Sequence, residues 1–253
     1  MKVKYYDLKN KRVFISGGGS GIGATIVEHF CEQNSEVYFI DINVKASKKL
    51  ISNIKKKKIR IPKFIECNIL DIKKLQNIIK DIIDNIGPIH CLINSAANDD
   101  RHTTEQVDEK YWENRMGINL KHYFFAAQSV VKGMKKIKSG SIVNLSSVSW
   151  MLGEGDKVVY ETAKSAVIGL TRSFAQEFGK YNIRTNSVIP GSIATERQIK
   201  NWLTPKYKKL ILDSQALKRQ LKPDDVARLV LFLSSDQSSG CTKQSFIIDA
   251  GIT

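Results

Sequence analysis

The chain has 253 residues, of which 42% are hydrophobic and 26% charged, a balance that excludes wholesale disorder. Its net charge of +15 comes from 31 lysines and only 9 arginines, whereas sites that read bases or grip phosphates favour arginine. We therefore expect a solvated basic surface that attracts anionic small ligands, and no nucleic-acid partner. No apolar run reaches about 18 residues and the four cysteines lie far apart, so we expect no membrane span, no metal site and a cytoplasmic protein.

Short apolar segments alternate with longer amphipathic ones along the whole chain. The apolar segments predict strands at Arg12–Ser16, Glu36–Ile40, Lys63–Cys67, Ile89–Asn94, Ser141–Ser146, Arg184–Ile189 and Ser245–Asp249. The amphipathic segments predict helices at Ile22–Gln33, Ala46–Lys57, Lys73–Ile86, Asp108–Lys138, Val158–Lys180 and Asp224–Ser234. Buried strands that alternate with helices indicate a parallel sheet covered on both faces. The fold class is therefore α/β: one doubly wound Rossmann-type domain of seven strands that spans residues 1–253.

A polar stretch from about residue 192 to about residue 221 interrupts this alternation just before the last helix. It carries Trp202 and Pro205 and has no strand pattern. An insertion beyond the carboxyl end of a strand is a usual place for a segment that covers a substrate. We expect a substrate lid here.

A glycine-rich loop follows the first predicted strand and opens the first predicted helix. It reads Ser16-Gly17-Gly18-Gly19-Ser20-Gly21-Ile22-Gly23. Glycines allow a sharp turn and let a pyrophosphate approach the free N–H groups of the helix. Asp41, at the end of the second strand, is placed to bind ribose hydroxyls and to repel a 2′-phosphate. The alternative for Asp41 is an N-cap of the next helix; the combination favours NAD as the cofactor.

Tyr160 and Lys164 lie four residues apart in Tyr160-Glu161-Thr162-Ala163-Lys164, on one face of a predicted helix. An ammonium group near a phenol lowers the pKa of the phenol, so Tyr160 is a candidate base for an alcohol proton. Ser147 ends the fifth predicted strand and should face the same crevice, where its hydroxyl can hydrogen-bond a substrate oxygen. The alternative is a surface pair of no chemical importance.

Together these motifs resemble the short-chain dehydrogenase/reductase family over essentially the whole chain. The resemblance makes Asn119, Ser147, Tyr160 and Lys164 the catalytic residues, with Tyr160 as the base and Asn119 supporting a proton relay. It implies NAD contacts at Gly17, Ser20, Gly21, Ile22, Gly23, Asp41, Ile42, Asn68, Ile69, Asn94, Ala96, Tyr160, Lys164, Pro190, Ile193 and Thr195. The two longest predicted helices carry apolar residues on more than one face, which suggests a subunit interface: Phe124, Phe125, Val167, Leu170 and Phe174. Family members commonly pair these helices, so the resemblance implies a homotetramer.

Three further segments lie at predicted carboxyl ends of strands: Asn98–His102, Ser149–Gly153 and Thr195–Gln198. We expect Asn98, Trp150 and Gln198, with Ser147 and Tyr160, to bind the substrate. The alternatives are a solvated turn at Asn98 and lid packing at Trp150. These motifs resemble bacterial sugar 1-dehydrogenases, which implies oxidation of the C1 hydroxyl of an aldose to a lactone.

Two other functions stay open at this stage. One is a dehydrogenase or reductase of another secondary alcohol or ketone on the same scaffold. The other is a nucleotide-binding sensor, or a nucleic-acid-binding protein that uses the basic surface. The intact Tyr160–Lys164 pair counts against the second class, because a sensor needs no base.

Overall fold

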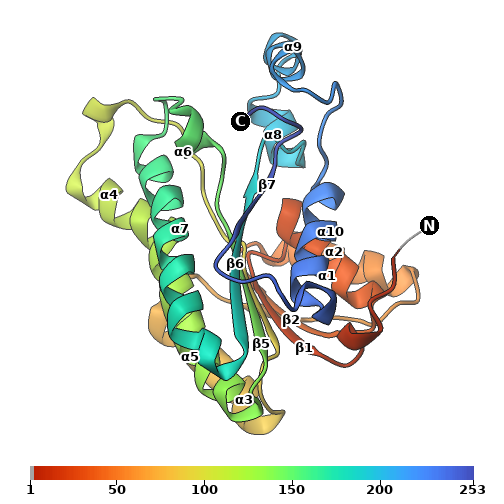
Figure 1. Ribbon diagram of the computed structural model, residues 1–253. Coiled ribbons are helices and arrows are strands. Elements are labelled where there is room, and N and C mark those ends of the chain that lie inside the picture. Colours follow the sequence, from red (N-terminus) through yellow and green to blue (C-terminus); the bar gives the residue numbers. More distant parts are fainter. Residues whose placement is uncertain (1–2) are drawn as a thin grey trace.

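Seven parallel strands form one sheet within residues 3–253, the part of the chain that the computed structural model describes (Figure 1). The strands lie in the order β3-β2-β1-β4-β5-β6-β7. Their bounds are β1 Arg12–Ser16, β2 Glu36–Asp41, β3 Lys63–Glu66, β4 Cys91–Asn94, β5 Gly140–Leu145, β6 Ile183–Pro190 and β7 Ser245–Ile248. The order reverses between β1 and β4, and a crevice at the carboxyl ends of strands is expected at such a switch point.

Helices cover both faces of this sheet, as the alternating pattern predicted. The helices are α1 Gly21–Glu32, α2 Val44–Lys56, α3 Ile72–Asn85, α4 Glu109–Met116, α5 His122–Ile137, α6 Ser149–Leu152, α7 Val158–Phe178, α8 Glu196–Asn201, α9 Pro205–Ser214 and α10 Pro223–Ser234. Helices α1, α2 and α10 lie on one face, and α3, α5 and α7 on the other (Figure 1). The prediction of a doubly wound α/β fold is confirmed.

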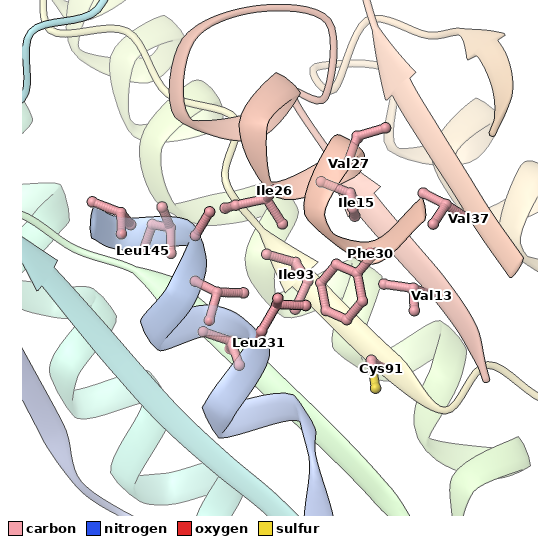
Figure 2. Packing of buried hydrophobic residues seen from close by; sticks show 14 of the residues in the cluster. Val13, Ile15, Ile26, Val27, Phe30, Val37, Cys91, Ile93, Leu145 and Leu231 are labelled. Carbon is pink, nitrogen blue, oxygen red and sulfur yellow. The ribbon is translucent and has the colours of Figure 1, made fainter. Parts of the chain in front are cut away.

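The hydrophobic core lies in two layers, one on each side of the sheet. Alternate residues of β1 show why: Val13 and Ile15 belong to the layer under α1 and α10, whereas Phe14 belongs to the layer under α3 and α5. Figure 2 shows the first layer, where Phe30 of α1 and Leu231 of α10 approach the strands. Every strand residue from 13 to 16 is buried, as a strand covered on both faces requires.

The helix predicted over Asp108–Lys138 is divided in the structure. A π-helical turn at Gly117–Lys121 separates α4 from α5. Inside this turn, the buried Asn119 side chain bonds both backbone groups of Asn98: Oδ1 accepts from its N–H at 2.8 Å, and Nδ2 donates to its C=O at 3.0 Å. Single π turns of this kind are frequent at functional sites, and hydrophobic periodicity does not reveal them.

The polar stretch expected as a lid contains two helices that the sequence reading did not assign. Thr195 caps α8 and Thr204 caps α9. The side chain of each threonine accepts the backbone N–H of the residue three positions later, and Pro205 lies in the first turn of α9. These are ordinary helix-start signals. Weak apolar periodicity hid them, because only Ile211 of α9 is buried.

The long helices keep less apolar surface exposed than the sequence suggested. Val167 and Phe174, which were expected to contribute to a subunit interface, are buried within the chain itself. Phe124 of α5 is 42% exposed, and Trp112 of α4 is also exposed. Val167 and Phe174 are therefore not available to a subunit interface, whereas Phe124 and Trp112 are.

His90, just before β4, ties that strand to β1. The imidazole Nδ1 of His90 accepts the backbone N–H of Arg12 at 3.0 Å, and the backbone N–H of His90 donates to the Arg12 carbonyl at 2.8 Å. Burial, aided by the positive charges of Lys11 and Arg12, lowers the pKa of His90 to about 4. A protonated His90 could no longer accept the Arg12 N–H.

We expect the free energy of unfolding to fall as the pH drops from about 6.5 to about 4, since the unfolded chain binds this proton and the folded chain does not. His90→Gln keeps an acceptor without the titration, so its stability should depend less steeply on pH over that window. Urea unfolding of both proteins at several pH values measures the slopes. Parallel slopes would contradict this assignment.

Candidate active site

An open cavity of about 920 Å³ lies at the carboxyl ends of the strands, where the strand order reverses. The glycine loop and the ends of β2 and β3 line one part, and the ends of β5 and β6 with α7, α8 and α9 line the other. The elements that carry the predicted motifs thus meet around one space. Nearly all predicted site residues line it; the exceptions are Gly21, Asn94, Asn119 and Trp150.

Close packing requires glycine at two positions of the loop. A Cβ on Gly23 would lie 2.0 Å from the carbonyl oxygen of Gly17, and a Cβ on Gly17 would lie 2.6 Å from Cα of Ala96. Gly17 also has a φ of +69°. The loop therefore presses against both α1 and the segment after β4. Ser20, the residue before α1, makes no capping bond with its side chain, which leaves the first N–H groups of the helix available to an anion.

Asp41 lies at the end of β2 and forms one wall of the cavity with Ile42. Its Oδ2 accepts the N–H of Gly19 and its Oδ1 accepts the N–H of Asn43, both at 2.8 Å. The carboxylate is thereby fixed beside the glycine loop. Asn68 and Ile69, after β3, also line the cavity, so these residues can hold the adenosine half of a dinucleotide.

Tyr160 and Lys164 lie one turn apart on α7, and both line the cavity with Ser147. The Nζ of Lys164 is 5.6 Å from the centre of the Tyr160 ring. Ser147 follows β5, and its Oγ accepts hydrogen bonds from the N–H and the hydroxyl of Ser149 at 3.2 and 3.0 Å. The structure brings this predicted trio together at one end of the cavity.

Burial is the main cause of the pKa shifts of Tyr160 and Lys164. Desolvation raises the pKa of Tyr160 above its ordinary value, and the negative charge of Asp99 adds to the increase, while the Ser147 hydroxyl opposes it. Desolvation lowers the pKa of Lys164 to about 7, against the pull of Asp99. The sequence hypothesis that Lys164 brings the pKa of Tyr160 near neutrality is therefore not borne out by the structure, because burial shifts that pKa upward.

Two of the predicted asparagines lie behind the cavity wall. Asn94 is fully buried, and its Nδ2 donates to Oδ1 of Asn144 at 2.9 Å. Asn119 is occupied by the backbone of Asn98, as described above. Both side chains position the wall rather than line it, which differs from the direct cofactor contact expected of Asn94.

The segment after β4 meets α8, in the stretch predicted as a lid, at the other end of the cavity. Gln198 of α8 donates from Nε2 to Oδ2 of Asp99 at 2.6 Å. Arg197 forms ion pairs with Asp99 at 3.2 Å and with Asp100 at 2.6 Å. Asn98 lines the cavity here and accepts the N–H of Asp100 at 2.9 Å. A polar wall results, made from two segments about 100 residues apart in the chain.

Trp150 does not line the cavity, although its neighbours Ser149 and Leu152 do. Its indole nitrogen is buried without a hydrogen-bond partner. The structure therefore does not place Trp150 where the substrate contact expected of it would require, and the alternative, lid packing, describes this side chain better.

Sequence reasoning missed several side chains of the cavity. Asp99 lies within the segment Asn98–His102, but only Asn98 of that segment was predicted to bind the substrate. Tyr207 and Ile211 come from the unassigned helix α9. Nothing in the local pattern marks them, because only the folding of α9 over the strand ends brings them to the cavity.

A dinucleotide-sized cavity at the switch point of a parallel sheet, with a tyrosine, a lysine and a serine at one end, defines an oxidoreductase of the Rossmann type. A family model described as enoyl-(acyl carrier protein) reductase matches residues 17–253. The chain belongs to the short-chain dehydrogenase/reductase family, whose members use nicotinamide cofactors.

Curated relatives cover nearly the whole chain. It is 43% identical to a D-xylose 1-dehydrogenase of Caulobacter vibrioides (strain NA1000 / CB15N), over 98% of this chain and 97% of the relative. It is 39% identical, with the same coverage, to a Rhizobium meliloti (strain 1021) protein named "Probable galactose dehydrogenase GalD". The crystal structure of a 3-oxoacyl-[acyl-carrier protein] reductase from Brucella melitensis ATCC 23457 superposes with a TM-score of 0.90 at 25% identity, covering 100% of this chain and 98% of that one.

Within residues 3–253, no helix is long and apolar enough to cross a membrane. The same residues contain no group of three or more His, Cys, Asp or Glu side chains that could hold a metal ion.

Gly23→Ala tests the role of the loop. Its Cβ would overlap the Gly17 carbonyl, so the loop must shift, at a cost of about 1–3 kcal/mol or roughly a 5- to 150-fold loss of dinucleotide affinity. Fluorescence titration with NADH and NADPH measures the affinity. The control is Gly179→Ala, where a Cβ meets nothing within 4 Å. Equal affinities of the two variants would show that the loop does not hold the dinucleotide.

Proposed function

We propose that the protein is an NAD-dependent aldose 1-dehydrogenase, which oxidises the C1 hydroxyl of an aldose to the lactone. The observation that carries this proposal is that the Tyr160–Lys164–Ser147 cluster and the polar wall of Asn98 and Gln198 line one cavity. A sugar has hydroxyls around a compact ring and needs several fixed polar partners. The two relatives named as sugar dehydrogenases support the same substrate class.

The residues present fit a nicotinamide dinucleotide. The crowded, side-chain-free loop at Gly17 and Gly23 leaves the start of α1 open to a pyrophosphate, and Asp41 provides acceptors for ribose hydroxyls. Pro190, Ile193 and Thr195 line the cavity toward the reacting end. Since a fixed carboxylate repels a 2′-phosphate, we propose NAD rather than NADP. When bound, NAD supplies the hydride acceptor.

The chain supplies the proton chemistry. Ser147 holds the C1 oxygen of the sugar, and Tyr160 accepts the proton of the C1 hydroxyl, so that the oxygen can form the lactone C=O. Because burial raises the pKa of Tyr160, the phenolate needs a positive neighbour. The Lys164 ammonium, 5.6 Å from the ring, is that neighbour, and its proton is retained only in part near pH 7.

The alternative is a reductase or dehydrogenase of another secondary alcohol or ketone. The similarity to the Brucella melitensis 3-oxoacyl reductase favours it, because the same catalytic cluster suits a keto group. We also propose, from the exposed Phe124 and Trp112, that α4 and α5 pair between subunits of a cytoplasmic homotetramer.

Steady-state turnover of an aldose panel tests the main proposal. We expect NADH formation with D-xylose or D-galactose and a higher kcat/KM with NAD than with NADP. Turnover of 3-oxoacyl thioesters and of no sugar would instead establish the alternative.

Tyr160→Phe removes only the ionisable hydroxyl, so kcat should fall by about 10²- to 10⁴-fold with NAD binding nearly unchanged.

Gln198→Ala tests the polar wall. Loss of its amide removes one hydrogen-bonding group at the cavity, so we expect kcat/KM for the preferred aldose to fall roughly tenfold or more, with a changed ranking of sugars and an unchanged KM for NAD. Lys200→Ala is the control, since Lys200 is exposed on the same helix and does not line the cavity. If both variants kept the wild-type ranking and kcat/KM, the wall would not select the sugar.

A further inference from the structure

Lys164 is hydrogen-bonded to a second tyrosine, Tyr123. Tyr123 of α5 is fully buried, comes from a different helix than Tyr160, and does not line the cavity. Its hydroxyl accepts a hydrogen bond from Nζ of Lys164 at 2.9 Å. The same hydroxyl donates to the carbonyl of Leu145, the last residue of β5, at 2.9 Å.

Lys164, Tyr123 and Leu145 form a closed triangle of hydrogen bonds. The third side is the bond from Nζ to the Leu145 carbonyl, at 2.8 Å. Since the Tyr123 proton is directed to Leu145, the phenolic oxygen presents a lone pair to Lys164 and acts as an acceptor. The Nζ atom also lies 5.1 Å from the centre of the Tyr123 ring, close to its 5.6 Å distance from the Tyr160 ring. Both features favour a charged ammonium over a neutral amine.

The other titratable groups around Nζ do not provide such an acceptor. His122 of α5 is buried, and desolvation and the charge of Lys164 lower its pKa to about 3, so it is neutral. Asp99 acts on Lys164 only through its charge and is paired with Arg197 of the lid. Tyr160 is the group that must itself give up a proton. Burial raises the pKa of Tyr123, which therefore stays a neutral hydroxyl.

We propose that Tyr123 is a positioning residue for the catalytic pair: its hydroxyl accepts a hydrogen bond from the Lys164 ammonium and so raises the share of the form in which Tyr160, rather than Lys164, has lost the proton. When the two side chains together lose one proton, it can leave either the phenol or the ammonium. Only the phenolate–ammonium form accepts the C1 proton of the substrate. An acceptor at Nζ stabilises that form against the phenol–amine form and so raises its share.

Tyr123→Phe removes the acceptor and leaves the ring. The Leu145 carbonyl keeps its bond from Lys164, so no buried carbonyl is left without a partner. A hydrogen bond to a charged group is worth about one pKa unit or slightly more. We therefore expect kcat to fall by roughly tenfold, while KM for NAD and for the aldose stays within about twofold.

Tyr38→Phe is a closely matched control. Tyr38 is also buried; its hydroxyl accepts from Nζ of Lys63 at 3.2 Å and donates to a carboxylate oxygen of Glu36 at 2.8 Å, and Lys63 lies 5.0 Å from its ring centre. It lies on β2 and does not line the cavity. The same chemical change there should leave kcat unaltered, even if the melting temperature falls as much as in Tyr123→Phe.

A direct titration of Lys164 gives a second readout that needs no turnover. Lysine labelled with 13C at Cε is followed by NMR across pH, and the Lys164 signal is identified by its absence in Lys164→Met. We expect a midpoint near 7 in the unaltered chain, a fall of about one unit in Tyr123→Phe, and no change in Tyr38→Phe.

The proposal rests on Tyr160 as the base, and the two can fail separately. If Tyr160→Phe retained the wild-type rate, the base assignment would be wrong, whereas the NMR titration would still report whether Tyr123 holds the ammonium. If Tyr160→Phe were inactive but Tyr123→Phe kept both the wild-type kcat and the wild-type midpoint, Tyr123 would be a packing residue only. A loss of rate with an unmoved midpoint would overturn the proposal as well.

Discussion

The site is organised around a lysine that is almost completely removed from water. Lys164 is 1% exposed, and an isolated ammonium in such surroundings is costly unless it is hydrogen-bonded. The end of β5 and helix α5 both contribute to its environment, through the Leu145 carbonyl and the Tyr123 hydroxyl. The register of the sheet and the packing of α5 against α7 thus determine whether this charge can exist where the chemistry needs it.

A second constraint is the close approach of backbone at the glycine loop. The Gly17 carbonyl lies where a side chain on residue 23 would stand, and Gly17 itself lies against Ala96. The hydroxyl of Ser16 reinforces this contact by accepting the N–H groups of Ser95 and Ala96. The glycine loop is therefore joined directly to the segment after β4, which lines the other end of the cavity.

Charge is arranged differently at the end of the cavity formed by the segment after β4 and α8. The acidic residues after β4 are paired with basic residues of other elements: Arg197 of the lid bonds Asp99 and Asp100, and Arg115 of α4 bonds Asp100 at 3.1 Å. Exposed ion pairs are individually worth little, but a network that joins three segments can set their relative positions. The stretch that the sequence predicted as a lid is also held by the Arg101 guanidinium, which lies 4.6 Å from the centre of the Trp202 ring.

The sequence by itself determined the fold class, the glycine loop and the Tyr160–Lys164 spacing, because these depend on short-range periodicity and on residue types that a turn or a helix requires. The sequence predicted a lid but not the two helices within it. It also predicted that Trp150 binds the substrate, whereas Trp150 does not line the cavity. Only the tertiary structure decided three hydrogen-bonded contacts: Asn119 with the backbone of Asn98, Gln198 with Asp99, and Lys164 with Tyr123. It also decided the direction of the pKa shifts at Tyr160 and Lys164. The physical reason is the same in each case: these contacts join residues far apart in the chain, and desolvation depends on everything packed around a group, which no local pattern records.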